Sequence, residues 1–131
     1  MNFPKELKYT KDDEWIKMLD DTTALIGITD YAQDQLNDIV FVTLPAVGDE
    51  VTADTPFGDV ESVKAVSDLV CPVTGVVAEV NEELDGSPEL LNSDPYGNWI
   101  IKVENITGYA DLMDADAYEA KTKEGKSMGT Y

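Results

Sequence analysis

Short segments of this chain alternate between apolar and polar residues or are rich in β-branched ones, and turn residues separate them. Segments of this kind cover residues 7–9, 14–19, 23–28, 39–44, 75–80 and 99–103. Alternation of this sort over a few residues is typical of half-buried β-strands. The pattern therefore predicts a mainly β protein in which helices are few.

Two other stretches space their apolar residues as a helix does. Thr29 can cap a short helix over residues 30–36, since its hydroxyl can accept a hydrogen bond from a free backbone amide. A second helix is expected over about 110–121. Its core-facing side would be formed by Leu112, Ala115 and Tyr118. Before it, residues 81–87 are predicted as an acidic loop and residues 88–92 as one helical turn.

The segment from Pro56 to Val70 organises the rest of the chain. Aliphatic residues alternate with polar ones on both sides of Lys64, which predicts two short strands of a half-buried hairpin. Lys64 would lie at or beside the turn, where its side chain points into solvent from a firm base. A second protein could bind this hairpin and reach the Lys64 amine, as a modification site requires. Residue type alone favours an ordinary solvated charge.

The chain is strongly acidic. It has 131 residues, of which 27 are Asp or Glu and nine are Lys or Arg, and its net charge is -18. The length predicts a single domain, with a core over about 7–121 and a loose tail over 122–131. The charge disfavours nucleic acid and anionic membranes as partners and favours proteins with basic docking faces. Alternatively, much of the acidity serves only solubility.

Catalytic and metal-binding side chains are scarce. The chain has no histidine and a single cysteine, Cys71, which excludes an internal disulfide, a cysteine–histidine zinc site and a histidine general base. It also lacks a G-x-S-x-G motif and a glycine-rich phosphate loop. The sequence therefore shows no catalytic motif that would support an independent enzyme. We expect Cys71 to be a buried, inert thiol. No apolar run reaches membrane-spanning length and no signal-like succession is present, so a cytoplasmic location is expected.

Several motifs carry a resemblance to a known family. The residues E-S-V-K-A at 61–65, S-D at 67–68 and P-V-T-G at 72–75 resemble the lipoylation hairpin of the H proteins of the glycine cleavage system. Further similar stretches are 27–42, 44–51, 88–103 and 110–118. The resemblance implies a lipoyl/biotinyl-type barrel-sandwich hybrid. An N-terminal strand extension, a short helix near 30–36 and a C-terminal helix would complete this fold.

The resemblance also implies a function. Lipoate would be attached to Lys64 by a lipoate ligase or an octanoyltransferase. The arm would then carry an aminomethyl intermediate and reducing equivalents between three enzymes: a pyridoxal-phosphate glycine decarboxylase, a tetrahydrofolate-dependent aminomethyltransferase and dihydrolipoamide dehydrogenase. The chain itself would be a non-catalytic carrier, because the reactive sulfur belongs to the cofactor.

The same resemblance assigns roles to individual residues. Glu61, Ser62, Val63 and Ala65 would be recognised by the lipoylating enzyme. Glu14 and Asp68 would line the pocket that receives the loaded arm, where a carboxylate could pair with an ammonium group. From its residue type alone, Glu14 would instead be read as an exposed strand carboxylate.

Two related carriers are alternatives. Asp13 stands where the family usually has histidine, which keeps open an H-like protein that relays lipoate to 2-oxoacid dehydrogenases. A biotin carrier shares the hairpin but typically has methionine on both sides of the lysine. Val63 and Ala65 flank Lys64 here, which disfavours biotin.

Overall fold

A computed structural model of the chain describes residues 1–123 and confirms a mainly β protein. The strands are Lys8–Tyr9 (β1), Glu14–Asp20 (β2), Thr23–Ile28 (β3), Ile39–Thr43 (β4), Glu50–Val51 (β5), Pro56–Ser62 (β6), Val66–Val70 (β7), Val73–Val80 (β8) and Ile101–Tyr109 (β9). The helices are Asp30–Leu36 (α1), Glu83–Gly86 (α2), Leu90–Ser93 (α3) and Ala115–Lys123 (α4). Among these helices, none has the length and apolar content that crossing a bilayer requires.

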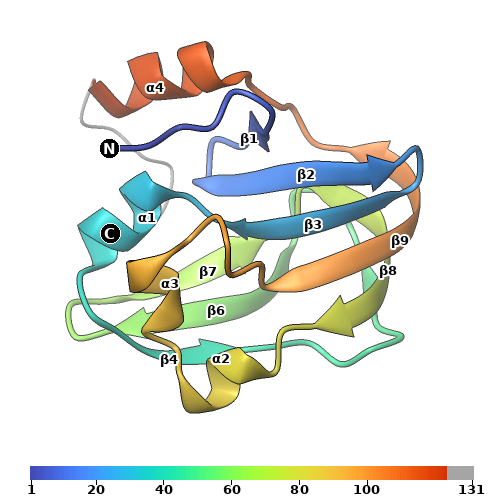
Figure 1. Ribbon diagram of the computed structural model, residues 1–131. Coiled ribbons are helices and arrows are strands. Elements are labelled where there is room, and N and C mark those ends of the chain that lie inside the picture. The colour runs from blue at the N-terminus through green and yellow to red at the C-terminus, as the bar shows by residue number, and fades with distance from the viewer. Residues whose placement is uncertain (124–131) are drawn as a thin grey trace.

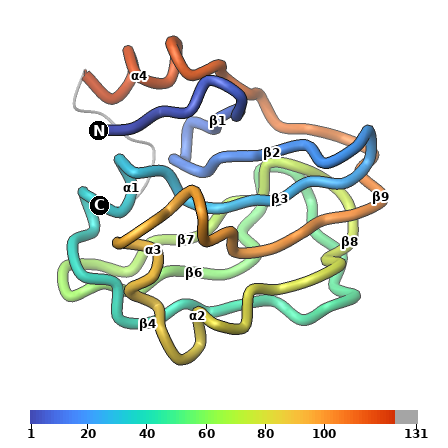
Figure 2. The backbone as a smooth tube through the Cα atoms, in the orientation of Figure 1, coloured from blue at the N-terminus to red at the C-terminus, as the bar shows by residue number. Residues whose placement is uncertain are grey.

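The strands form two sheets that pack against each other (Figure 1). One sheet has six strands in the order β1-β2-β3-β9-β8-β5, and the other has three in the order β4-β6-β7. The chain passes from the large sheet to the small one through α1, as the tube in Figure 2 shows. The hairpin β6–β7 therefore supplies the centre and one edge of the small sheet.

The main core fills the space between the sheets. Ile26, Ile101 and Val103 of the large sheet lie in the same buried cluster as Val60 and Leu69 of the small sheet. Alternate side chains of a strand point to opposite faces, so each strand contributes one face to this core. Burial of this apolar surface is the main force that holds the two sheets together.

The predicted helix over 30–36 is confirmed, together with its cap. The Thr29 hydroxyl accepts a hydrogen bond from the Ala32 amide at 3.1 Å, which satisfies one of the free donors of the first turn. Ala32 and Leu36 are buried in the main core, as their spacing predicted.

A second cluster joins the N-terminal segment to helix α4, which lies over that segment in Figure 1. Tyr9 stacks on Tyr118 with ring centroids 4.7 Å apart. Trp15 belongs to the same cluster and is buried. This packing fixes the strand extension against the rest of the fold.

The C-terminal helix begins at Ala115, later than predicted. Residues 110–114 are not helical, because Met113 pairs with Tyr9. The Met113 amide donates to the Tyr9 carbonyl at 2.7 Å, and the Tyr9 amide donates to the Met113 carbonyl at 2.9 Å. Leu112 therefore lies outside the helix, although it still packs on the main core.

Smaller differences concern the connections. The predicted loop at 81–87 contains helix α2, and the predicted turn at 88–92 is displaced to α3. Strand β9 continues to Tyr109, well past the expected end, because it pairs with β8 along its length. Helix α4 takes in the first two residues of the expected tail at 122–131, and the rest of that tail lies outside the described residues.

Gly58 of β6 lies where strand β4 leaves no room for a side chain. A Cβ there would collide with the backbone carbonyl of Thr43, which belongs to the paired strand and cannot move aside. We expect Gly58→Ala to lower the free energy of unfolding by about 2 kcal/mol in a denaturant titration. Gly108→Ala is the control, because a Cβ there meets nothing closer than 3.8 Å; its effect should stay below about 0.5 kcal/mol. Equal effects of the two substitutions would contradict this steric account.

Candidate functional site

Lys64 lies in the turn between β6 and β7, and Ser62 holds this turn together. The Ser62 hydroxyl oxygen accepts hydrogen bonds from the amides of Lys64 at 3.1 Å and Ala65 at 3.0 Å. The Ser62 amide donates to the Ala65 carbonyl at 2.8 Å. The buried Ser62 therefore fixes the conformation of the turn through its hydrogen bonds, and with it the backbone position of Lys64.

The turn is also tied to the segment that follows helix α1. The Val63 amide donates to the Asp38 carbonyl at 3.0 Å. The Lys64 amine donates to the Gln35 carbonyl at 3.2 Å, while the lysine side chain stays exposed. The predicted exposed lysine on a firm hairpin is therefore present. In Figure 1 the turn lies at the same end of the molecule as α1.

A narrow cleft with a volume of about 10 Å³, room for about one water molecule, lies between the two sheets next to this hairpin. Its walls come from β2, β3, β6, β7 and α1. The lining residues are Asp12, Glu14, Ile28, Ala32, Leu36, Val60, Ser67, Asp68 and Leu69. The lining is mostly apolar and includes three acidic residues, Asp12, Glu14 and Asp68. This chemistry suits an apolar group with a cationic end, but a group of that size could enter only if the walls moved apart.

Glu14 is buried, with only 1% of its surface exposed, so the interpretation as an exposed strand carboxylate is wrong. Its Oε1 accepts from the Thr10 hydroxyl at 2.7 Å, and its Oε2 accepts from the Val70 amide at 3.2 Å. Burial raises the pKa of Glu14 well above its ordinary value, although the hydrogen bonds from Thr10 and Val70 oppose the change. The side chain therefore bridges β2 of one sheet to β7 of the other.

The structure brings Asp68 to the same cleft as Glu14. Asp68 is exposed and lies in β7 between Ser67 and Leu69, whose side chains are buried. Asp12 is a further lining residue that the sequence analysis did not select. Partial burial raises its pKa, with Lys11 acting in the opposite direction. Its only sequence signal was a position two residues before Glu14, which is weak in a chain this acidic.

Asp13 faces helix α4. It is buried, its backbone has a φ of 70°, and its carboxylate accepts from the Tyr118 hydroxyl at 2.9 Å. The Lys121 amine lies 4.0 Å from the same carboxylate. Asp13 thus serves the packing of the C-terminal helix.

Cys71 is confirmed as a buried residue in the main core. Burial raises the pKa of its thiol to about 12, which leaves almost no thiolate at neutral pH. It is therefore an inert thiol, as expected.

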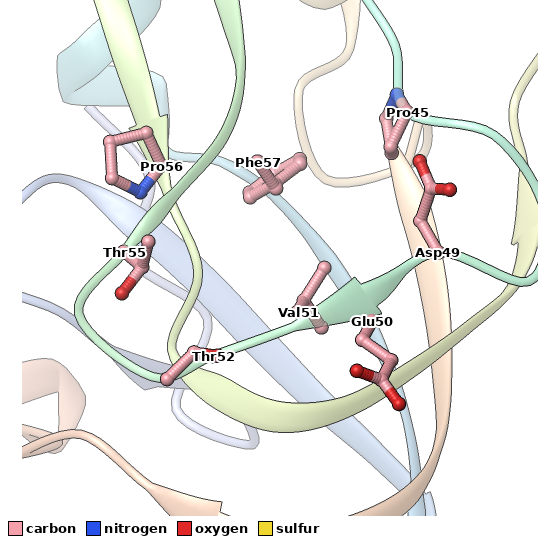
Figure 3. Close-up of a pocket in the computed structure, with 8 residues that line it drawn as sticks. All are labelled: Pro45, Asp49, Glu50, Val51, Thr52, Thr55, Pro56 and Phe57. Atoms are coloured by element: carbon pink, nitrogen blue, oxygen red, sulfur yellow. The ribbon is translucent and has the colours of Figure 1, made fainter.

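Another hollow lies at the opposite end of strand β6 from Lys64 (Figure 3). It is lined by Pro45, Asp49, Glu50, Val51, Thr52, Thr55, Pro56 and Phe57. None of these residues was predicted as part of a site. The hollow opens widely to solvent and shares no lining residue with the cleft beside the lysine.

Comparison with known proteins connects this geometry to a family. A family model described as "Glycine cleavage H-protein" matches residues 7–125. Glycine cleavage system H proteins of Symbiobacterium thermophilum and Halalkalibacterium halodurans are 54% and 55% identical to this chain; the matches cover 95% and 94% of this chain and 98% of each relative. The chain belongs to the glycine cleavage H-protein family. The resemblance drawn from the motifs is thereby confirmed.

Structural comparison agrees with this assignment. The crystal structure of a glycine cleavage system H protein from Mycobacterium marinum matches with a TM-score of 0.87 at 38% identity, over 92% of this chain and 98% of that one. The predicted barrel-sandwich fold is confirmed by this match and by the two packed sheets. Members of the H-protein family are lipoyl carriers in glycine catabolism.

The burial of Glu14 has a consequence for stability. Because its pKa is higher in the folded chain than in the unfolded one, the folded state binds the proton more tightly, and stability falls as pH rises above the ordinary carboxyl range. We expect the Glu14→Gln variant to lack this loss. Urea titrations from pH 4 to pH 7 would measure the free energy of unfolding of both proteins. It should fall more steeply with pH in the unchanged protein than in Glu14→Gln, and the two slopes should differ by up to about 1.4 kcal/mol per pH unit.

The test compares only how the unfolding free energy changes with pH in the two proteins. A loss of stability that is the same at every pH therefore does not affect the result. Asp20→Asn is a suitable control, because backbone and side-chain hydrogen bonds lower the pKa of that exposed carboxyl. Because this carboxyl is ionised in both the folded and the unfolded chain over most of the range from pH 4 to pH 7, its removal should change the slope little. Parallel slopes for the unchanged protein and Glu14→Gln would contradict the account of Glu14.

Proposed function

We propose that this H protein carries lipoate in amide linkage on Lys64. On this arm it would shuttle an aminomethyl group and reducing equivalents between glycine decarboxylase, aminomethyltransferase and dihydrolipoamide dehydrogenase. The observation that carries the proposal is the position of Lys64. Its exposed amine extends from a turn that Ser62 closes, beside a cleft that reaches the buried Glu14.

The attachment step needs only a neutral amine and an activated acyl group. The Lys64 amine would attack the carbonyl carbon of an activated lipoyl or octanoyl group, supplied by a ligase or an octanoyltransferase. A C–N bond forms, the bond to the activating group breaks, and that group leaves while the nitrogen loses a proton. The lysine thereby loses its positive charge.

The residues around Lys64 would contribute to recognition in different ways. Glu61 and Val63 are exposed and can contact the lipoylating enzyme directly. Ser62 is buried and acts through the shape of the turn, and Ala65 supplies the amide and carbonyl that close it. The recognised feature would therefore be a preorganised turn together with two side chains.

The cleft has the chemistry that a lipoyl arm would require. When bound, lipoate supplies a reactive cyclic disulfide at the end of a long flexible tether. If the walls of the cleft moved apart to admit the arm, Ala32, Leu36 and Leu69 would cover its apolar part and exclude water. Glu14 and Asp68 would pair with an ammonium group on the cargo, since both residues line this space.

The lipoate-relay alternative rested on Asp13 in place of histidine. Asp13 contacts helix α4 through Tyr118 and is not among the residues that line the cleft. Its identity therefore has a packing explanation, and no observation favours a relay over a carrier of glycine cleavage.

Replacement of Lys64 by arginine tests the attachment site. We expect Lys64→Arg to abolish lipoylation and glycine oxidation in the reconstituted system, because a guanidinium cannot form the amide. Intact mass and peptide mapping after expression with lipoate would locate the modification. Lys17→Arg, on an exposed position of β2, is the control and should be lipoylated normally. Lipoylation of Lys5, Lys8 or Lys17 in the unchanged protein would refute the proposal.

The two cleft carboxyls should protect the cargo. We expect Glu14→Gln combined with Asp68→Asn to shorten the lifetime of the loaded carrier roughly tenfold, because the ammonium group loses the carboxylate of Asp68 and the carboxyl oxygens of Glu14, and water gains access. Ammonia release from loaded carrier, without aminomethyltransferase, measures this lifetime. Asp59→Asn is the control, because Asp59 pairs with Asp68 in register but does not line the cleft. An unchanged release rate in the double variant would remove this role.

A further inference from the structure

Four apolar side chains are exposed close to the turn that carries Lys64. Their exposed fractions are Val40 48%, Phe41 52%, Val66 55% and Val63 70%. Val63 and Val66 belong to the hairpin, whereas Val40 and Phe41 come from the neighbouring edge strand β4. Clustered exposed apolar residues of this size often mark a surface that another molecule covers. We call these four residues the apolar patch.

A β-bulge creates half of this patch. The register of β4 against β6 shifts between Ile39 and Phe41, so the regular alternation of the strand is broken. Ile39 and Val42 are buried, while both Val40 and Phe41 are exposed. Without the bulge, two successive residues would point to opposite faces. Bulges commonly re-aim side chains next to functional sites.

The strand register places the patch in a defined relation to carboxylates. Phe41 pairs with Glu61, and Glu61 pairs with Val66, so these three side chains form one row across the small sheet. The next row on the same face, farther from the turn, contains Asp59 and Asp68. Glu61 therefore lies between Phe41 and Val66, and Asp59 and Asp68 lie along one side of the patch.

We propose that the apolar patch is the docking surface for the enzyme that attaches the lipoyl group, and that this enzyme presents apolar side chains together with basic ones opposite Glu61, Asp59 and Asp68. The inference rests on the proposed lipoylation of Lys64 and adds Val40 and Phe41 of β4 to the hairpin residues already assigned. Apolar contact supplies affinity, and pairing with Glu61, Asp59 and Asp68 orients the partner.

The position of the patch identifies this partner. The attaching enzyme must bring its reacting carbonyl carbon to the Lys64 amine itself, so its surface must cover the residues that surround the turn. Val63 precedes Lys64, and Val66 follows two residues after it.

A second copy of the chain fits the patch poorly. Two copies joined through this face would bring the carboxylates of Glu61, Asp59 and Asp68 near their equivalents, and each chain carries a net charge of -18. Like charges across an interface repel. Complementarity therefore favours a basic partner.

Steady-state lipoylation of the full-length unmodified carrier tests the proposal. Purified lipoate ligase, ATP and lipoate are supplied, and the lipoylated product is counted by intact mass at several carrier concentrations. We expect Phe41→Ala to raise the KM for the carrier about tenfold with little change in kcat. Val66→Thr keeps the side-chain shape on an exposed strand position and should raise KM about threefold. For the unchanged carrier, kcat/KM should fall as salt is added.

Leu19→Ala is the matched control, because Leu19 is 47% exposed on β2 of the other sheet. It should leave KM within about twofold, and its thermal unfolding midpoint should match that of Phe41→Ala. If Phe41→Ala and Val66→Thr have the same KM as Leu19→Ala, the proposal that the patch is a docking surface is wrong. That result would leave the proposed lipoylation of Lys64 intact. A dimer of unchanged carrier in sedimentation that Phe41→Ala dissociates would also overturn it. Failure of the unchanged carrier to gain a lipoyl group on Lys64 would refute the proposed function itself.

Discussion

The hydrogen bonds of the buried Glu14 connect the two sheets at the functional end of the molecule. One carboxylate oxygen accepts from Val70 in the small sheet and the other from Thr10 beside the large sheet. Burial of a carboxyl group costs free energy unless its hydrogen bonds are satisfied, so this connection holds only with both partners in place. It sets the position of the hairpin over β2 and thereby the width of the cleft. A single side chain thus couples sheet packing to the shape of the site.

A fixed backbone and an exposed side chain are combined at Lys64. Ser62 closes the hairpin turn through several hydrogen bonds, and the Val63 amide is tied to the segment after α1. The base of the lysine is therefore fixed, while its side chain is exposed. A carrier needs this combination, because a fixed base presents the amine to a modifying enzyme and a free arm can reach other active sites. The stack of Tyr9 on Tyr118 stabilises the terminal segments at a distance from that motion.

Charge and apolar surface act at different ranges. The net charge of -18 extends over the whole molecule and can speed association with basic partners without defining where they bind. Position has to come from a local feature, and the patch around Phe41 and Val66 is such a feature beside Lys64. The single cysteine of the chain, Cys71, is buried, so its thiol is kept away from the surface.

The sequence by itself determined the elements that depend on near neighbours. The two hairpin strands, the lysine between them and the Thr29 cap were all predicted, because alternation and capping are set by residues a few positions apart. Tertiary structure decided what depends on distant partners. Pairing of Met113 with Tyr9 delayed the last helix, and the Val70 amide and the packed sheets made Glu14 a buried bridge. Such contacts join residues that lie far apart in the chain, and no local pattern encodes them.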